Sequence, residues 1–223
     1  MNLSCGHEPR SDFRYLAFSE LAQPHPVSAI VFLHGSGERG SDLSDVARYG
    51  LPAMLSQGRA STSGAVLCPQ LEAGREWDPE RVATFIRSID DQYSTKVLMG
   101  FSLGGSGVCE VLSAVGAIVP LAIVIAGRGP SRVQADQTGV RVLSIRGDLD
   151  DWPDMQSFLS GVQSSGGQVH EVELAGQGHF ISETALDDPS VSAMLLDVGL
   201  CLKIVHALAR DHRVVDCLRQ GEV

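Results

Sequence analysis

The sequence has few basic residues. Lys and Arg number 17 against 27 Asp and Glu, which gives a formal net charge of −10. Nucleic acids and anionic membrane surfaces are bound through clustered positive charge, so this balance argues against both kinds of partner. An acidic excess of this size favours solubility and says little about the fold.

Long apolar runs and paired cysteines are also lacking. No apolar run reaches the roughly 18 residues that a membrane span needs. Residues 1–10 lack the basic segment and the apolar stretch of a secretory signal. The cysteines are widely separated, odd in number and form no CxxC pair, so neither a zinc site nor a disulfide framework is expected. We expect free thiols in a cytoplasmic protein, at Cys5, Cys68, Cys109, Cys201 and Cys217.

What the sequence does have is an ordinary globular composition, with 43% hydrophobic and 20% charged residues in 223. A chain of this size buries about 70% of its surface on folding, which gives a sizeable core. Short β-rich runs, most of them ending at Gly or Pro, predict strands. These runs are residues 29–33, 65–68, 96–99, 121–125, 140–145 and 169–174.

Helical patterns separate the later runs. Residues 79–91 have apolar side chains at helical spacing behind a capping Asp78 and Pro79, and helices are also expected over 103–117, 155–162 and 192–210. Residues 13–18 alternate weakly and suggest an antiparallel edge strand. Alternating strands and helices predict an α/β fold, with a doubly wound, mostly parallel sheet, helices on both faces and a single domain over residues 1–223.

One segment carries a recognisable nucleophile motif. Gly100-Phe-Ser-Leu-Gly104 matches G-x-S-x-G, which alone is a weak signal. Here the motif follows a predicted strand and opens a predicted helix, as a nucleophile elbow does. Ser102 is therefore the candidate nucleophile; the alternative is a glycine turn that only allows close packing of helix and sheet.

A serine nucleophile needs a histidine base and an orienting acid, in the chain order Ser, Asp or Glu, His in this kind of fold. His179 follows the last predicted strand, at the edge where α/β sites form, whereas His170 begins that strand and His206 and His212 fall in the terminal helical region. The alternative for His179 is an ordinary loop histidine.

The acid is expected in the loop after residues 140–145, which offers Asp148, Asp150 and Asp151. Asp150 ranks first, then Asp148, whose side chain is expected to cap the turn. Because successive side chains point in opposite directions, the side chain of Asp151 is expected to point away from that of Asp150. The alternative for this acidic loop is a solvated turn.

The oxyanion formed during acyl transfer needs hydrogen-bond donors. The backbone N–H of Leu103, directly after the nucleophile, is one expected donor. The second is expected from the loop after residues 29–33, at Ser36, with Gly37 as the next choice. Trp77 and Trp152 are the only tryptophans and fall in loops at the same edge, where they either line the substrate pocket or simply pack.

Four segments together resemble the α/β-hydrolase superfamily: His34-Gly-Ser-Gly-Glu-Arg-Gly40, Gly100-Phe-Ser-Leu-Gly-Gly105, Gly147-Asp-Leu-Asp150 and Gly178-His179. Within it the chain looks most like small lidless carboxylesterases of the dienelactone-hydrolase and phospholipase/carboxylesterase types. The resemblance covers about residues 27–182. It implies a serine esterase that acts on a small-molecule ester through an acyl-enzyme, with no metal or organic cofactor. In the superfamily the acid commonly stands in Gly-x-x-Asp, an offset that Asp150 has from Gly147, with Val-Pro about three residues further on. Here Asp-Trp-Pro follows Asp150, which places the proline one residue short of that pattern.

Other functions stay open on the sequence. A thioesterase or a peptidase/amidase would use the same scaffold. Gly35-Ser-Gly-Glu-Arg-Gly40 also spells G-x-G-x-x-G, but Glu38 would face a pyrophosphate and no apolar helix follows, which argues against a dinucleotide-binding protein. A non-catalytic ligand-binding protein would be expected to have a broken triad.

Overall fold

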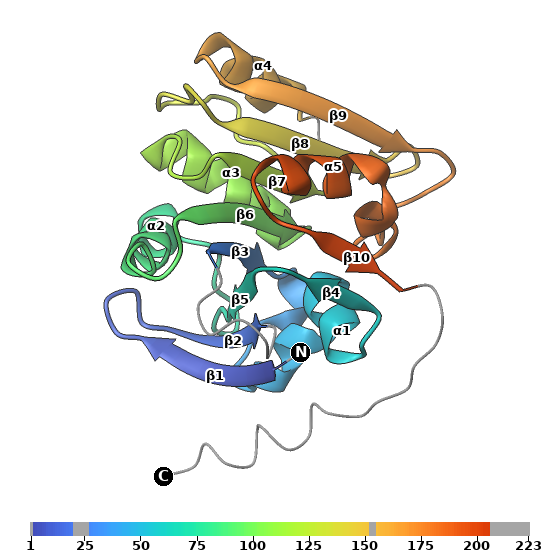
Figure 1. The fold of residues 1–223 in the computed structure, drawn as a ribbon. Helices are drawn as coiled ribbons and strands as arrows, with labels where there is room; N and C mark the ends of the chain where they lie inside the picture. Colours follow the sequence, from blue (N-terminus) through green and yellow to red (C-terminus); the bar gives the residue numbers. More distant parts are fainter. Residues whose placement is uncertain (1, 20–26, 152–154, 206–223) are drawn as a thin grey trace.

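The computed structural model describes residues 2–19, 27–151 and 155–205 (Figure 1). One eight-stranded sheet has the order β1-β2-β5-β3-β6-β7-β8-β9, and β10 pairs with β4 in a separate two-stranded sheet. All pairs from β5 to β9 are parallel, whereas β1 and β2 are antiparallel. The strands are β1 (Asn2–Glu8), β2 (Phe13–Ser19), β3 (Ser28–Leu33), β4 (Ala60–Thr62), β5 (Ala65–Pro69), β6 (Thr95–Phe101), β7 (Leu121–Ile125), β8 (Arg141–Gly147), β9 (Gln168–Leu174) and β10 (Leu202–Ile204).

Helices cover both faces of this sheet. The α-helices are α1 (Gly50–Ser56), α2 (Pro79–Ser88), α3 (Leu103–Val115), α4 (Gln156–Ser164) and α5 (Pro189–Asp197), and the short 3₁₀ helices are η1 (Ser36–Glu38), η2 (Leu43–Ala47) and η3 (Thr184–Asp187). Alternate residues of one strand enter opposite cores: Met99 packs with α1 and α5, and Leu98 packs with α2, α3 and α4. This two-sided burial explains the near-continuous apolar strands and confirms the predicted doubly wound fold.

The sheet changes direction between β3 and β6. From β3 the chain passes to β5 on one side, and then returns to β6 on the other side of β3. In parallel sheets such a switch point opens a crevice at the carboxyl ends of the strands. The loops after β3 and β6 therefore lie where a site is expected.

The predicted helix over residues 192–210 is right over residues 192–197 and wrong over residues 198–205. Helix α5 begins at Pro189 behind the capping Asp188 and ends at Asp197, because Gly199 takes a φ of +76° that breaks the helical path. The chain then forms β10, which pairs antiparallel with β4. This pairing joins segments some 140 residues apart, so no local pattern indicated it. Residues 206–210 lie outside the described part of the chain, as do His206 and His212.

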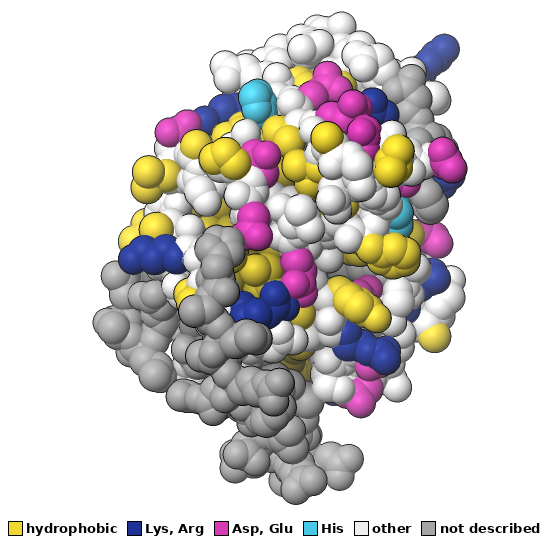
Figure 2. All heavy atoms as spheres, turned by 90° about the vertical axis from the view of Figure 1, so that its right-hand side faces the viewer, with side chains coloured by type: hydrophobic (Ala, Val, Ile, Leu, Met, Phe, Trp, Pro, Cys, Tyr) yellow, Lys and Arg dark blue, Asp and Glu magenta, His cyan; other side chains and the backbone are white. Residues whose placement is uncertain are grey.

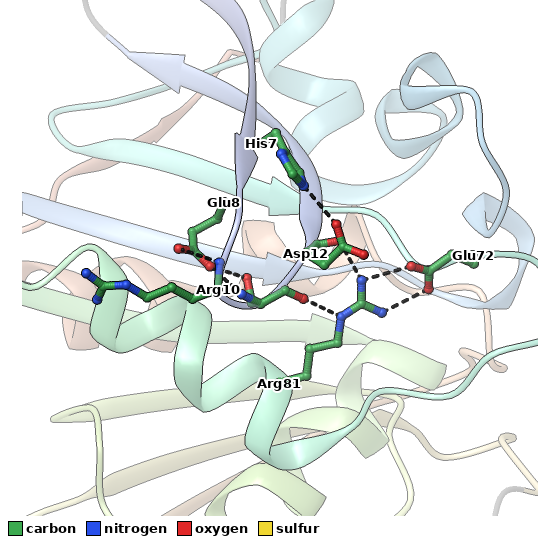
Figure 3. A network of polar contacts seen from close by, with 7 residues as sticks. His7, Glu8, Arg10, Asp12, Glu72 and Arg81 are labelled. Carbon is green, nitrogen blue, oxygen red and sulfur yellow. Dashed lines mark hydrogen bonds and ion pairs between the residues drawn. The ribbon is translucent and has the colours of Figure 1, made fainter.

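The segment 13–18 is antiparallel as predicted, but it is not the edge of the sheet. β1 pairs along its whole length with β2 and takes the edge position. Arg81 of α2 holds the turn of this hairpin: its guanidinium donates to the backbone carbonyls of Ser11 and Asp12 and pairs with Glu72 (Figure 3). The guanidinium also lies 3.9 Å from the ring centroid of Phe13. The hairpin is thereby fixed to the first turn of α2.

The surface agrees with the acidic composition. Seen from the right-hand side of Figure 1, Lys and Arg side chains of the described residues are scattered among acidic and hydrophobic ones and form no broad patch on that face (Figure 2). None of the described helices is long and apolar enough to cross a membrane. The four cysteines in the described ranges form no disulfide.

Candidate active site

Ser102 sits at a strained turn between β6 and α3. Its φ of 55° and ψ of −115° are rarely adopted by residues other than glycine. Its backbone N–H donates to the Ile125 carbonyl, and its own carbonyl accepts from the Ser106 N–H, which starts the helix. Strain of this kind persists only where the surrounding structure fixes it, and it is common at active sites.

Two glycines make this turn possible. A Cβ atom on Gly100 would overlap the backbone of Gly104, and one on Gly104 would overlap the carbonyl of Leu33. The helix can therefore start directly against the ends of β3 and β6. This close approach is the structural reason for the G-x-S-x-G spacing, and it leaves the Ser102 side chain facing out of the turn.

A chain of hydrogen bonds connects Ser102 to a histidine and an aspartate. Ser102 Oγ lies 2.8 Å from Nε2 of His179, and Nδ1 of His179 lies 2.9 Å from Oδ2 of Asp150. The Asp150 side chain is 6% exposed and that of His179 is 21% exposed. With Nδ1 donating to the carboxylate, Nε2 is free of a proton and can accept one from the serine hydroxyl.

The loops that carry His179 and Asp150 are bonded to each other. β8 and β9 pair in parallel up to Gly147 and Leu174, so both loops leave the sheet at the same edge. The Leu149 N–H then donates to the Gln177 carbonyl at 2.9 Å. This backbone bond holds the acid loop against the histidine loop, although 29 residues separate Asp150 from His179.

The loop after β3 lies beside the serine and is fixed by a buried histidine. His34 is 1% exposed; its Nδ1 donates to the Gly35 carbonyl, and its Nε2 accepts from the Leu71 N–H at 3.0 Å. Burial lowers the pKa of His34 to about 4, so the ring is neutral at pH 7. Both ring nitrogens are therefore used to shape the backbone around Ser36.

This histidine makes folding sensitive to acid. Its pKa in the folded protein lies below the ordinary value of 6.5, so the unfolded chain takes up the proton first as the pH falls. Stability is expected to fall between pH 6.5 and pH 4, by about 3 kcal/mol from this group. Urea unfolding at pH 7 and pH 4.5 should show a smaller pH-dependent loss for His34→Gln than for the wild type. Equal losses in the two proteins would contradict this.

A buried carboxyl group lies under the same loop. The side chain of Glu38 is 4% exposed, and its Oε2 lies 3.8 Å from Nδ1 of His34 without a hydrogen-bond partner of its own. Burial raises the pKa of Glu38, which favours the protonated form. The Gln70 amide donates to the Glu38 carbonyl and ties this turn to the end of β5. Sequence patterns gave no sign that this glutamate would be buried.

A cavity of about 510 Å³ opens beside Ser102. One face of α3 lines it, together with the loop after β3, the segment before α2 and the loop after β7. Trp77, 4% exposed, forms part of its wall, and its indole N–H donates to the His34 carbonyl. The lining residues are Ser36, Arg39, Glu76, Trp77, Pro79, Ser102, Leu103, Ser106, Gly107, Glu110, Arg128 and Gly129.

The structure brings most of the predicted site residues to this edge. Ser36 and Leu103 line the cavity and begin η1 and α3, where backbone N–H groups have no acceptor within the helix. Gly37 lies in η1, where a Cβ atom would meet nothing within 4 Å. His170 lies near the start of β9, away from Ser102, and Trp152 falls outside the described residues.

Sequence reasoning missed the charged residues of the cavity. Arg39 lies in the G-x-G-x-x-G stretch but had no role assigned to it there, and Glu110 and Arg128 belong to no motif. Two signals pointed to them: Glu110 continues the face of α3 that starts at Leu103, with the helical spacing of i, i+3, i+4 and i+7, and Arg128 follows the carboxyl end of β7.

The described residues hold no cluster of three His, Cys, Asp or Glu side chains arranged to bind a metal ion. The G-x-G-x-x-G stretch does not open an α-helix; it forms the three-residue η1, and the Glu38 side chain turns inward. A dinucleotide pyrophosphate is bound at the start of a helix that follows such glycines, so this loop lacks the required geometry.

No family model matches the sequence, and no curated protein is significantly similar to it. Solved structures are similar in fold. A thermostable esterase has a TM-score of 0.68 at 16% identity over 88% of this chain, and the match spans 62% of the length of that esterase. A carboxylesterase from Mesorhizobium loti has a TM-score of 0.58 at 18% identity, with 88% and 99% of the two chains covered. Thermogutta terrifontis esterase 2, in a form phosphonylated by cyclosarin, has a TM-score of 0.61 at 14% identity, covering 89% and 94%. The chain therefore shares the fold of these esterases.

Proposed function

We propose that the protein is a serine hydrolase that cleaves small carboxylic esters. The observation that carries the proposal is the chain of hydrogen bonds from Ser102 through His179 to Asp150. A serine hydroxyl becomes a useful nucleophile when a base accepts its proton and an acid orients that base. The similarity in fold to several esterases supports the same reaction class.

In the first half of the proposed reaction, Nε2 of His179 takes the proton of Ser102 as Oγ bonds to the ester carbonyl carbon. The carbonyl oxygen becomes an oxyanion, which the backbone N–H groups of Ser36 and Leu103 stabilise. The C–O bond to the alcohol then breaks, and His179 gives its proton to the departing oxygen. Asp150 stabilises the imidazolium during both proton transfers. The product is an acyl group on Ser102 and a free alcohol.

Water completes the cycle in the second half. His179 takes a proton from a water molecule, and the resulting hydroxide oxygen bonds to the acyl carbon. When the bond to Ser102 breaks, the proton returns to Oγ and the carboxylic acid leaves. No step requires a metal ion or an organic cofactor, because the serine, the histidine and the backbone donors supply every proton and charge contact.

The purified protein is expected to hydrolyse p-nitrophenyl acetate and butyrate at the same rate with and without EDTA, because the proposed chemistry uses no metal. A thioester and an amide with the same acyl group, assayed beside these esters, would rank the thioesterase and amidase alternatives. Activity that disappears on chelation, or an amide cleaved faster than its ester, would contradict the proposal.

A further inference from the structure

The cavity beside Ser102 extends from the serine to one side only of the Ser102–His179 pair. Its lining runs along α3 from Leu103 to Glu110 and takes in the loop after β7, but it does not include His179 or Asp150. Phe180, 89% exposed, and Leu149, 66% exposed, flank these two residues instead. Ser102 thus has a polar cavity on one side and exposed apolar side chains next to the histidine.

If the proposed function holds, the acyl and alcohol parts of an ester bind on different sides of Ser102. His179 must protonate the departing oxygen, so the alcohol lies on the histidine side of Ser102. The acyl chain leaves the carbonyl carbon in another direction. The cavity is lined by Ser102 and not by His179, so we infer that it takes the acyl chain.

Arg128 brings an exposed, positively charged side chain to that space, and its backbone is held in place. Its backbone N–H donates to Oγ of Ser106 at 2.9 Å, and the N–H of Ser106 donates to the carbonyl of Ser102. The residue is thereby anchored one helical turn from the nucleophile. Within the described ranges its guanidinium has no ion-pair partner, whereas Arg39, the other arginine of the cavity, lies 3.6 Å from Glu76.

Glu110 limits how far an anion could extend. It lies eight residues beyond Ser102 on α3, which at 1.5 Å per residue is about 12 Å along the helix, against about 6 Å for Ser106 beside Arg128. A carboxylate on a short acyl chain would meet Arg128 first. A longer chain would bring its carboxylate toward that of Glu110, which repels it.

We propose that the preferred substrates are half-esters of short dicarboxylic acids, with the free carboxylate of the acyl chain bound by Arg128. A guanidinium suits this role because its planar donors match the two oxygens of a carboxylate. The uncharged alcohol of such a substrate would lie toward Phe180.

The test compares three esters in a pH-stat: monoethyl glutarate, ethyl valerate and O-valeryl glycolate. The first carries its charge on the acyl part, the second has no charge, and the third carries its charge on the alcohol. The wild type is expected to prefer monoethyl glutarate. Arg128→Ala should lower kcat/KM for this substrate about tenfold, mainly through KM, because one charge-assisted contact is lost. Ethyl valerate and O-valeryl glycolate should change less than twofold.

Matched variants separate local from general charge effects. Arg132→Ala removes the same charge from the same loop at an exposed position outside the cavity, and should leave all three rates unchanged. Glu110→Gln should raise kcat/KM for longer half-esters such as monoethyl suberate. The substrate proposal is wrong if Arg128→Ala leaves kcat/KM for monoethyl glutarate unchanged, or if it lowers kcat/KM for O-valeryl glycolate instead. The proposed esterase function would stand in either case. If the wild type hydrolyses none of the three esters, the proposed function fails as well.

Discussion

Ser102→Ala is expected to lower kcat for ester hydrolysis by on the order of 10⁶, which is the loss known for removal of the nucleophile in a serine protease. Ser102 Oγ is the atom that would form the acyl bond, and it lies at the strained turn 2.8 Å from Nε2 of His179. The measurement is initial rates on p-nitrophenyl butyrate, with the folded state checked by circular dichroism.

Covalent labelling gives the same prediction an independent readout. A fluorophosphonate probe should add once to the wild type, and mass spectrometry should locate the adduct on Ser102. Ser131→Ala, at an exposed serine in the loop after β7, serves as control and should label normally. A Ser102→Ala protein that still labels or keeps its activity would remove this serine from the mechanism.

Asp150→Asn is expected to lower kcat about 10⁴-fold, by the serine-protease precedent. The carboxylate oxygen at 2.9 Å accepts the Nδ1 proton of His179 and so leaves Nε2 free to act as a base. An asparagine can turn its NH₂ group toward Nδ1 and hold the opposite tautomer, in which Nε2 already carries a proton. Asparagine is the better test than alanine, because a neighbouring carboxylate could move into the space that alanine leaves.

Asp148→Asn and Asp151→Asn are the matched controls, because both exposed residues belong to the same loop and lose the same charge. Each should stay within about tenfold of the wild type, since a nearby surface charge acts only weakly through water. A large loss at Asp148 with a small one at Asp150 would mean that the acid has been misassigned.

The central strands could be predicted from sequence because both of their faces are buried. Apolar runs such as Leu121–Ile125 end at small residues, and the observed strand has the predicted bounds. β1 gave no such signal: Asn2–Glu8 has an exposed, polar pattern and is a strand because β2 pairs with it. The terminal helix was overextended for a related reason, since β10 depends on its pairing with β4.

In the site, too, local sequence patterns could be predicted and contacts between distant segments could not. Ser102 and His179 were found through motifs whose spacing reflects a tight turn and a strand end, and the structure brings their side chains into hydrogen-bond contact. Asp150 was preferred for its offset from Gly147 and its spacing from His179, and its Oδ2 lies 2.9 Å from Nδ1 of His179. Arg128 belongs to no motif, and the motif that contains Glu38 gave no sign of its burial, because both positions depend on how separate loops meet.

The position of β9 at the edge of the sheet affects how well the site resists heat and denaturant. This strand has β8 as its one neighbour in the sheet, and its side chains alternate between exposed and half-buried. Edge strands held from one side open more easily than central ones, by local fluctuations that leave the rest of the fold intact. His179 follows this strand, whereas Ser102 follows β6 in the middle of the sheet. His179 is therefore the member of the Ser102–His179–Asp150 hydrogen-bond chain most readily displaced. If these residues carry the proposed activity, its loss on heating or in denaturant would begin at His179 while Ser102 stays in place.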